Sequence, residues 1–316
     1  MKSFYSQGKL LLTGEYVVLD GAIALAVPSI YGQSLDIEKG EVGMLKWSSL
    51  DENGDLWFEV EFELKGSEII DSRTPRNDVS DRLLEILNAA KQLNPEFLLD
   101  LKGYHITTEL GFPKNWGLGT SSTLITNIAS WAKVDAYKLL KMTFGGSGYD
   151  IACAKANESL TFQLIKKDNA ILNQVQDEST QDIKSVYFDP AFKDHIYFVH
   201  LNQKQNSRDG IKQYRKNTSD KSSLIKKINA ITQQMISCES LVEFQKLMDD
   251  HEALISEVIN ERPIKSSMFS DFNGSIKSLG AWGGDFVMVA SKDNPTAYFE
   301  SKGFTTILSY SEMVLA

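Results

Sequence analysis

Pro113-Lys-Asn-Trp-Gly-Leu-Gly-Thr-Ser-Ser-Thr123 is a glycine-rich loop between a predicted strand, Leu101–Leu110, and a predicted helix that begins near Thr120. Gly117 and Gly119 lack a Cβ atom, so the backbone there can lie directly against a ligand. The hydroxyl residues that follow fall where the free N–H groups of a helix N-terminus point outward, and such a terminus binds phosphate well. The loop therefore predicts an anion site made from backbone dipoles.

Two familiar phosphate loops do not match this stretch. No Lys-Ser or Lys-Thr pair follows the second glycine, as a Walker A loop requires. The third glycine of the dinucleotide-binding fingerprint is also missing. Taken alone, the Gly-x-Gly pattern before a helix is equally compatible with a structural turn.

The composition is that of an acidic, globular chain. It has 316 residues, a net charge of -9, 42% hydrophobic residues and 24% charged residues. This length predicts two domains with a sizeable core. The negative charge argues against non-specific binding to nucleic acid or to an anionic membrane. We therefore expect a small molecule as partner, and a protein that is a monomer or a homodimer.

The sequence also carries signals of cellular location. No stretch approaches a membrane span, and the first residues lack the apolar core of a signal peptide. Cys153 and Cys238 are the only cysteines, too few for a disulfide framework, and we expect both to be small buried residues. These features predict a cytoplasmic protein.

The pattern of apolar residues predicts a mixed α+β chain. Short strands dominate the first third, among them Tyr16–Leu19, Ala22–Val27 and Gln33–Glu38. Asp81–Leu93 has the apolar face of a helix. Further on we expect a hairpin of Leu160–Ile165 with Ala170–Gln174, then, after a boundary, a strand, two amphipathic helices and the strand Phe286–Ala290. The polar segment Val175–Lys193 marks that boundary, which gives domains of residues 1–190 and 191–316.

Another stretch of interest is Gly8-Lys-Leu-Leu-Leu-Thr-Gly-Glu-Tyr16. A lysine at the start of an apolar strand is unusual, because a buried ammonium group needs a partner. Lys9 either extends to water along a sheet edge or points toward an acid or a phosphate.

A further glycine-rich stretch is Gly146-Ser-Gly-Tyr-Asp150-Ile-Ala. An aspartate at the start of a helix is by default a cap. The functional alternative is a carboxylate held near a substrate hydroxyl, and Lys9 could keep such a carboxylate ionised.

The last motif is Lys277-Ser-Leu-Gly-Ala-Trp-Gly-Gly-Asp285, which enters a strand. Glycines in such a position permit close approach of backbone. That approach serves either packing or a ligand.

Taken in order, these elements resemble the GHMP kinase superfamily, which includes galactokinase, homoserine kinase, mevalonate kinase and phosphomevalonate kinase. Gly8–Tyr16 looks like its first motif, Pro113–Thr123 like its second, the phosphate loop, and Gly280–Asp285 like its third. The segment around Asp150 is similar to the one that carries the catalytic aspartate in the mevalonate-type branch. The resemblance spans Gly8 to Ala290, and it is greatest to mevalonate and phosphomevalonate kinases.

The resemblance implies a two-domain fold and an activity. The fold would combine an N-terminal mixed-sheet βαβ domain, similar to a ribosomal protein, with a C-terminal ferredoxin-like α/β sandwich. The activity would be ATP-dependent phosphoryl transfer to a small-molecule hydroxyl or phosphate, with mevalonate or phosphomevalonate as acceptor in isoprenoid precursor synthesis. Phosphomevalonate needs extra basic residues, and Lys204 and Arg208 are the only obvious candidates, so mevalonate is slightly favoured. The alternatives are a diphosphomevalonate decarboxylase and a non-catalytic metabolite-binding protein.

The resemblance also implies roles for single residues. Asp150 would orient or deprotonate the acceptor hydroxyl, and Lys9 would offset charge on the transferred phosphoryl group. The ATP phosphates would be bound by the phosphate loop, at Gly117, Leu118, Gly119, Thr120, Ser121 and Ser122. Ser121 would contact Mg²⁺. The residues expected in the substrate cleft are Glu15, Gly148, Gly280, Gly283 and Gly284.

The chain departs from the family pattern in its metal site. Mevalonate kinases usually carry a glutamate, a magnesium ligand, about three helical turns before the catalytic aspartate. Here residues 134–143 offer only Asp135, at the wrong spacing. Either Ser121, ATP and water hold the ion, since Mg²⁺ often keeps several waters, or the metal site has been lost.

Overall fold

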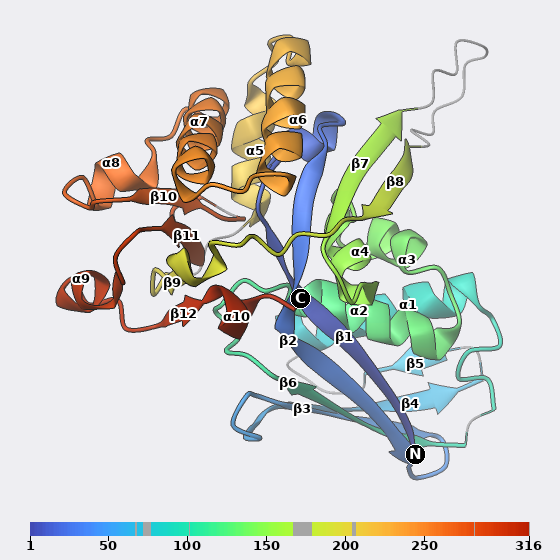
Figure 1. The fold of residues 1–316 in the computed structure, drawn as a ribbon. Helices are drawn as coiled ribbons and strands as arrows, with labels where there is room; N and C mark the ends of the chain where they lie inside the picture. Colours follow the sequence, from blue (N-terminus) through green and yellow to red (C-terminus); the bar gives the residue numbers. More distant parts are fainter. Residues whose placement is uncertain are drawn as a thin grey trace, which may run out of the picture. The chain divides into compact units, whose positions relative to one another are not determined.

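The computed structural model describes residues 1–66, 68–71, 77–100, 102–166, 179–203, 207–280 and 282–315 (Figure 1). The chain divides into two compact units. Unit 1 contains Met1–Gly8, Tyr31–Lys114 and Leu118–Lys155; unit 2 contains Lys9–Ile30, Asn115–Gly117 and Ala156–Ala316. The strands β1 (Lys2–Leu11) and β2 (Ala24–Lys39) each contribute residues to both units. The predicted domain boundary near residue 190 stays a prediction.

Unit 1 is a mixed sheet with helices on one face. The strands follow the order β5-β4-β3-β6-β2, with β3 and β6 parallel and the other neighbours antiparallel. They are β3 (Met44–Leu50), β4 (Leu56–Lys65), β5 (Glu68–Ile70) and β6 (Tyr104–Leu110). The helices are α1 (Asp78–Leu93), α2 (Thr120–Ala132), α3 (Ala136–Thr143) and α4 (Tyr149–Lys155). Figure 1 shows α1 and α2 along one face of the sheet.

The core of unit 1 follows from the alternation of apolar residues in its strands. In β4 every second side chain is buried, from Phe58 to Leu64, because successive side chains point to opposite faces. Trp47 of β3 and Phe62 of β4 share one buried cluster with Ile128 of α2. This contact places α2, which begins at the predicted phosphate loop, directly on the sheet.

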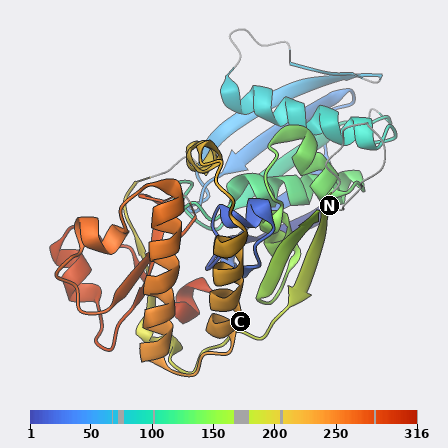
Figure 2. The ribbon, with the colours of Figure 1, turned by 90° about the horizontal axis from the view of Figure 1, so that it is seen from above.

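Unit 2 contains a four-stranded antiparallel sheet in the order β10-β11-β9-β12. Its strands are β9 (Ile196–His200), β10 (Ser275–Ser278), β11 (Phe286–Ala290) and β12 (Ile307–Ser309), and a hairpin of β7 (Leu160–Lys166) and β8 (Ser179–Ser185) pairs with residues 24–26 of β2. The α-helices are α5 (Ser207–Lys216), α6 (Ser222–Ile236), α7 (Leu241–Ile259), α8 (Ile264–Met268), α9 (Thr296–Ser301) and α10 (Tyr310–Met313); η1 (Val17–Asp20) and η2 (Lys193–His195) are short 3₁₀ helices. Figures 1 and 2 show α6 and α7 side by side, and α7 packs on β10.

The α+β class predicted from the sequence is confirmed, and several of the predicted helices and strands are present. The predicted helix Asp81–Leu93 is most of α1, and the predicted strand Phe286–Ala290 is β11. The two expected strands Ala22–Val27 and Gln33–Glu38 are parts of one long strand, β2. Within the described residues, no helix combines the length and apolarity that a membrane span requires.

The prediction of a strand at Tyr16–Leu19 is wrong. The segment forms η1, with the Leu19 N–H donating to the Tyr16 carbonyl at 3.0 Å. Tyr16 has a positive φ of 62°, and Gly21 ends the turn with a φ of 95°. Val17 and Val18 favour a strand by their branched side chains, but here burial in unit 2 decides their conformation.

The structure also bears on two polar segments of the sequence, the one that follows β7 and the one that follows β9. The sequence predicts Ala170–Gln174 as the partner of β7; that segment lies outside the described residues, and the described partner is β8. The residues of β8 are mostly polar, so only pairing with β7 identifies them as a strand. Ser207 and Arg208 begin the helix α5, and Lys204 lies outside the described residues.

Candidate functional site

Three sequence motifs meet within unit 2 at Gly117. Lys9, from the first motif, donates a hydrogen bond from Nζ to the Gly117 carbonyl at 3.1 Å. Gly117 has a positive φ of 67°, and a Cβ built on it would overlap the carboxyl group of Asp285 and lie 2.9 Å from the Asp285 Cβ. Gly117 is therefore required both by its backbone conformation and by the third motif packed against it.

The residues just before Gly117 are held by strands β9 and β11. The Asn202 N–H donates to Nδ1 of His200, so the proton of this ring lies on Nε2, which donates to the Asn115 carbonyl at 3.0 Å. Trp116 packs edge-on against Phe286, with ring centroids 5.3 Å apart. Residues 115–117 of the phosphate loop are thus fixed in unit 2.

The second half of the phosphate loop opens helix α2 in unit 1. Gly119 is the N-cap residue with a φ of 95°, and as a glycine it has no side chain to cap the helix. The Ser122 hydroxyl donates to the Gly119 carbonyl at 2.8 Å, and Ser121 is exposed. Of the predicted hydroxyls, Ser121 therefore has the greatest access to a ligand in solvent.

Helix α2 is anchored to the strands of unit 1 by buried polar contacts. The Thr123 hydroxyl donates to Oε1 of Gln33 at 2.7 Å. Asn127 donates to the Gln33 carbonyl at 2.9 Å and accepts a hydrogen bond from the Ser6 hydroxyl at 2.7 Å. These bonds fix the N-terminal turns of α2, and with them the N–H groups available to an anion.

Asp150 lies in the first turn of α4 in unit 1, where it is half-buried. Its carboxylate accepts a hydrogen bond from the Ile151 N–H at 3.1 Å. Gly148 precedes it with a φ of 90°, and a Cβ there would lie 3.0 Å from the ring of Tyr137. Burial raises the pKa of Tyr137 to about 12, helped by the charges of Asp135 and Asp150. The Tyr137 hydroxyl thus stays protonated beside the helix that carries Asp150.

Asp135 has a structural role in this arrangement. One of its carboxylate oxygens accepts hydrogen bonds from the N–H groups of Tyr137 and Lys138, at 2.8 and 3.0 Å. It is therefore the N-cap of α3. Among the described residues, no group of three or more His, Cys, Asp or Glu side chains is arranged to hold a metal ion.

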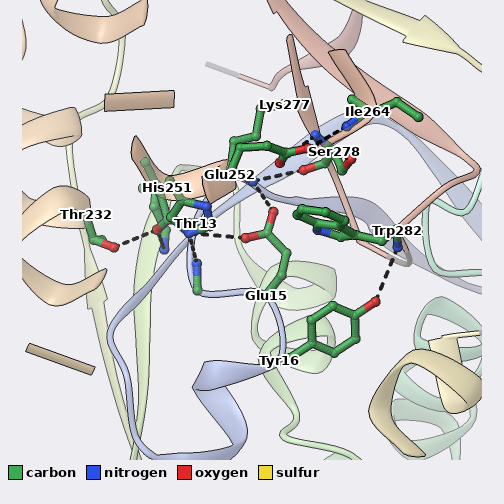
Figure 3. Close-up of polar contacts among 12 residues, drawn as sticks. Thr13, Glu15, Tyr16, Thr232, His251, Glu252, Ile264, Lys277, Ser278 and Trp282 are labelled. Atoms are coloured by element: carbon green, nitrogen blue, oxygen red, sulfur yellow. Dashed lines mark hydrogen bonds and ion pairs between the residues drawn. The ribbon is translucent and has the colours of Figure 1, made fainter. Parts of the chain in front are cut away.

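Glu15, expected in the substrate cleft, is buried in unit 2 (Figure 3). Its carboxylate forms an ion pair with Lys277, which is also fully buried. His251 accepts a hydrogen bond at Nε2 from the Gly14 N–H at 2.9 Å, and this atom lies 3.4 Å from Glu15 Oε2. The structure therefore gives Glu15 a charged partner inside unit 2, and its place in the substrate cleft stays a prediction.

Glu252, next to His251 on α7, belongs to the same cluster. Its carboxylate accepts hydrogen bonds from the N–H and the hydroxyl of Ser278, at 3.1 and 2.9 Å. Burial raises the pKa of Glu252 to about 7, although the Lys277 charge and these hydrogen bonds oppose the shift. The group therefore titrates near neutral pH.

The third motif forms the loop between β10 and β11. The Leu279 N–H donates to the Phe286 carbonyl at 3.2 Å, which closes the hairpin at the base of the loop. Gly280 has a φ of 64°, with nothing within 4 Å of a Cβ built on it, and Gly284 is buried. The Trp282 N–H donates to the Tyr16 hydroxyl at 3.3 Å. This loop is thereby tied to the first motif.

The predicted site residues are divided between the units. Unit 2 holds Lys9, Glu15, Gly117, Gly280, Gly283 and Gly284; unit 1 holds Leu118, Gly119, Thr120, Ser121, Ser122, Gly148 and Asp150. Within unit 2 the first, second and third motifs converge. The expected approach of Lys9 to Asp150 concerns both units and stays a prediction.

Four residues of this arrangement were not assigned a functional role from the sequence: Tyr137, His251, Glu252 and Lys277. His251 and Glu252 lie on the apolar face of α7. A glutamate beside a histidine on such a face is a sequence signal for buried polar groups that need partners. Lys277 is the one lysine in the short buried strand β10. Such a lysine needs a partner, but the partner, Glu15, is 262 residues away in the sequence.

The sequence matches no protein-family model and no curated protein. Solved structures similar to the chain include the mevalonate kinase of Methanococcus jannaschii, at 14% identity and a TM-score of 0.68, with 98% of each chain covered. The chain has the GHMP kinase fold. The phosphomevalonate kinase of Streptococcus pneumoniae, in complex with phosphomevalonate and AMPPNP, has 17% identity and a TM-score of 0.64, covering 96% of this chain and 95% of that one. The galactokinase of Lactococcus lactis, complexed with galactose, has 14% identity and a TM-score of 0.65, covering 98% and 92%.

These matches confirm the two-domain fold inferred from four short motifs. The similarity covers nearly the whole chain, so it extends well beyond the phosphate loop. At such low identity it establishes the fold and leaves the reaction to be argued from the residues.

We expect Gly117→Ala to be strongly destabilising, because it combines a disfavoured backbone conformation with a clash at Asp285. The free energy of unfolding should fall by roughly 3 kcal/mol. Gly54→Ala is the matched control, since Gly54 also has a positive φ but nothing lies within 4 Å of its Cβ position. The control should lose about 1 kcal/mol, from backbone strain alone. Equal losses in urea unfolding would contradict the packing of Asp285 on Gly117.

The raised pKa of Glu252 predicts that stability falls as pH rises. Between the ordinary pKa of 4.5 and about 7, the unfolded state releases the Glu252 proton while the folded state retains it. This single group should lower the free energy of unfolding by about 3 kcal/mol across that window and change nothing above it. Glu252→Gln should remove this part of the slope in urea unfolding at a series of pH values.

The control for this measurement is Glu257→Gln, which changes an exposed glutamate on the same helix. Its pH dependence should follow that of the parent protein. If Glu252→Gln also follows the parent protein from pH 4.5 to 7, Glu252 does not titrate near neutrality.

Proposed function

We propose that this chain is an ATP-dependent kinase that phosphorylates a small molecule. The observation that supports this most is the meeting of three motifs at Gly117. Lys9 binds its carbonyl, and Asp285 packs against its Cα. A loop built only as a turn has no need of an ammonium group and a carboxylate on the same glycine.

The phosphates of ATP are proposed to bind at the N-terminus of α2. Its N-cap residue, Gly119, has no side chain to accept from the first N–H groups, which favours their binding an anion. The backbone from Gly117 to Ser122 supplies these groups. Binding by backbone dipoles also fits a chain of net charge -9, which cannot rely on a broad basic surface.

Asp150 is the proposed base for the acceptor. It would accept the proton of the acceptor hydroxyl as that oxygen attacks the γ-phosphorus, and ADP would leave with the electrons of the broken bond. Lys9 would offset the charge of the transferred group. The half-buried position of Asp150 at a helix start and the flanking Gly148 support this assignment.

The residues present fit Mg²⁺ that arrives with ATP. The exposed hydroxyl of Ser121 can serve as one oxygen ligand, and phosphate oxygens and water can supply the rest, as this ion prefers. When bound, Mg²⁺ would neutralise charge on the phosphates. Asp135 is excluded as a further ligand in this proposal because it caps α3.

Mevalonate is the first candidate acceptor and phosphomevalonate the second. Both kinds of enzyme occur among the structural neighbours, as does galactokinase, so the fold alone does not select one of them. The choice rests on the motifs of the sequence and on the scarcity of basic residues expected near the substrate. We also propose a cytoplasmic enzyme, since both cysteines are buried and too few for a disulfide framework.

The direct test is ADP release with mevalonate, phosphomevalonate, diphosphomevalonate, homoserine and galactose. Mevalonate should stimulate release most, and Asp150→Asn should lower kcat at least about a hundredfold, because the general base is lost. Asp135→Asn is the matched control: it changes an exposed aspartate that caps a helix, so kcat should stay near that of the parent enzyme.

Other outcomes would replace this proposal. If none of the acceptors stimulates ADP release, or if Asp150→Asn keeps the full rate, the catalytic assignment is wrong. Release of carbon dioxide from diphosphomevalonate would identify a decarboxylase. Binding of nucleotide and acceptor without turnover would identify a non-catalytic metabolite-binding protein.

A further inference from the structure

A cluster of four buried ionisable residues lies in unit 2. We call Glu15, His251, Glu252 and Lys277 the buried charge cluster (Figure 3). Its members come from the first motif, from α7 and from β10, at the start of the third motif. Figure 3 shows the carboxylate of Glu15 pointing toward Lys277 and His251. None of the four has a part in the proposed chemistry.

The ion pair of Glu15 with Lys277 is enclosed by protein. The side chain of Lys277 is 0% exposed and that of Glu15 is 1% exposed. Lys277 also donates to the Ser278 carbonyl at 2.9 Å. Removing two charges from water is unfavourable, and apolar residues of similar volume often serve stability as well or better. Stability alone is therefore a weak reason for this pair.

His251 adds no charge to the cluster. Its Nε2 accepts the Gly14 N–H, so the ring proton lies on Nδ1 and the imidazole is neutral. Burial and the nearby Lys277 lower the pKa of His251 well below its usual range. Of the four residues of the cluster, only Lys277 is then positively charged, and it faces two carboxyl groups, those of Glu15 and Glu252.

The cluster holds two of the sequence motifs together. Glu15 lies between Gly14, which binds His251, and Tyr16, whose hydroxyl accepts the Trp282 N–H. On the other side, Glu252 holds both the N–H and the hydroxyl of Ser278. The third-motif loop is therefore bound at Ser278, the residue just before it, and at Trp282 within it.

We propose that Lys277 is a positioning residue: its ion pair with Glu15 holds the described residues of the third-motif loop, 279–280 and 282–285, against residues 14–16 of the first motif. Because Asp285 of this loop packs on Gly117, the pair also sets how well the phosphate loop binds nucleotide. This second consequence rests on the proposed function, whereas the first does not.

The test compares Lys277→Met, Glu15→Met and the double variant with the parent protein. Each single variant leaves one charge buried without its partner and should be strongly destabilised. The double variant removes both charges and should regain most of the parent's unfolding midpoint. If the pair positions the loop, the double variant should nevertheless show about tenfold less protection from hydrogen exchange in residues 279–286 and 12–17.

The matched control is Lys46→Met/Glu59→Met, which removes an ion pair at 3.1 Å whose side chains are 40% and 41% exposed. This control should leave hydrogen exchange in both segments unchanged. If the Lys277→Met/Glu15→Met protein keeps the parent's protection there, the pair serves folding only and the proposal is overturned.

Binding of AMPPNP by calorimetry tests the second consequence. The double variant should bind about tenfold more weakly, a difference near 1.4 kcal/mol. If it loses protection but binds AMPPNP as the parent does, the link from the pair to nucleotide binding is overturned. If the parent itself binds no AMPPNP, the proposed function fails, and hydrogen exchange still decides the positioning role.

Discussion

The contact of Asp285 with Gly117 is the constraint on which the candidate site depends. It joins segments separated by about half of the chain, and it leaves no space for a side chain at residue 117. Lys9 binds the carbonyl of the same glycine. One residue of the phosphate loop is thus held by the first and the third motif together.

The phosphate loop combines two physical roles in adjacent residues. Asn115 and Trp116 are fixed to the strands β9 and β11 by a hydrogen bond and by ring packing. Gly119 is then the N-cap of α2 and has no side chain to cap it. A loop held firmly on one side and open at its backbone N–H groups on the other is suited to bind an anion with little reorganisation.

The sequence was a good guide wherever the signal was local. The glycine and serine pattern at residues 113–123 correctly indicates a loop that leads into a helix. The spacing of apolar residues in Asp81–Leu93 correctly predicts most of α1. It failed where distant pairing decides the structure. Mostly polar β8 is a strand only because β7 lies beside it, and Val17 and Val18 lie in η1, buried in unit 2, despite their strand-favouring side chains.

The same limit applies to the candidate site. Glycine motifs identify residues that approach a ligand, so Gly117, Ser121 and Asp150 could be proposed from their neighbours in the sequence. The resemblance implies a cleft position for Glu15, but nothing near it in the sequence indicates that it pairs with Lys277, far along the chain. Such a pairing can be recognised only once the fold brings the two residues together.

The most direct test of the account is a crystal structure of the protein with AMPPNP, Mg²⁺ and mevalonate. We predict that the phosphates contact the backbone N–H groups of residues 119–122, that Mg²⁺ contacts the Ser121 hydroxyl, and that the acceptor hydroxyl lies within hydrogen-bond distance of Asp150. Nucleotide bound away from the N-terminus of α2, or an acceptor hydroxyl out of reach of Asp150, would contradict the proposed kinase site.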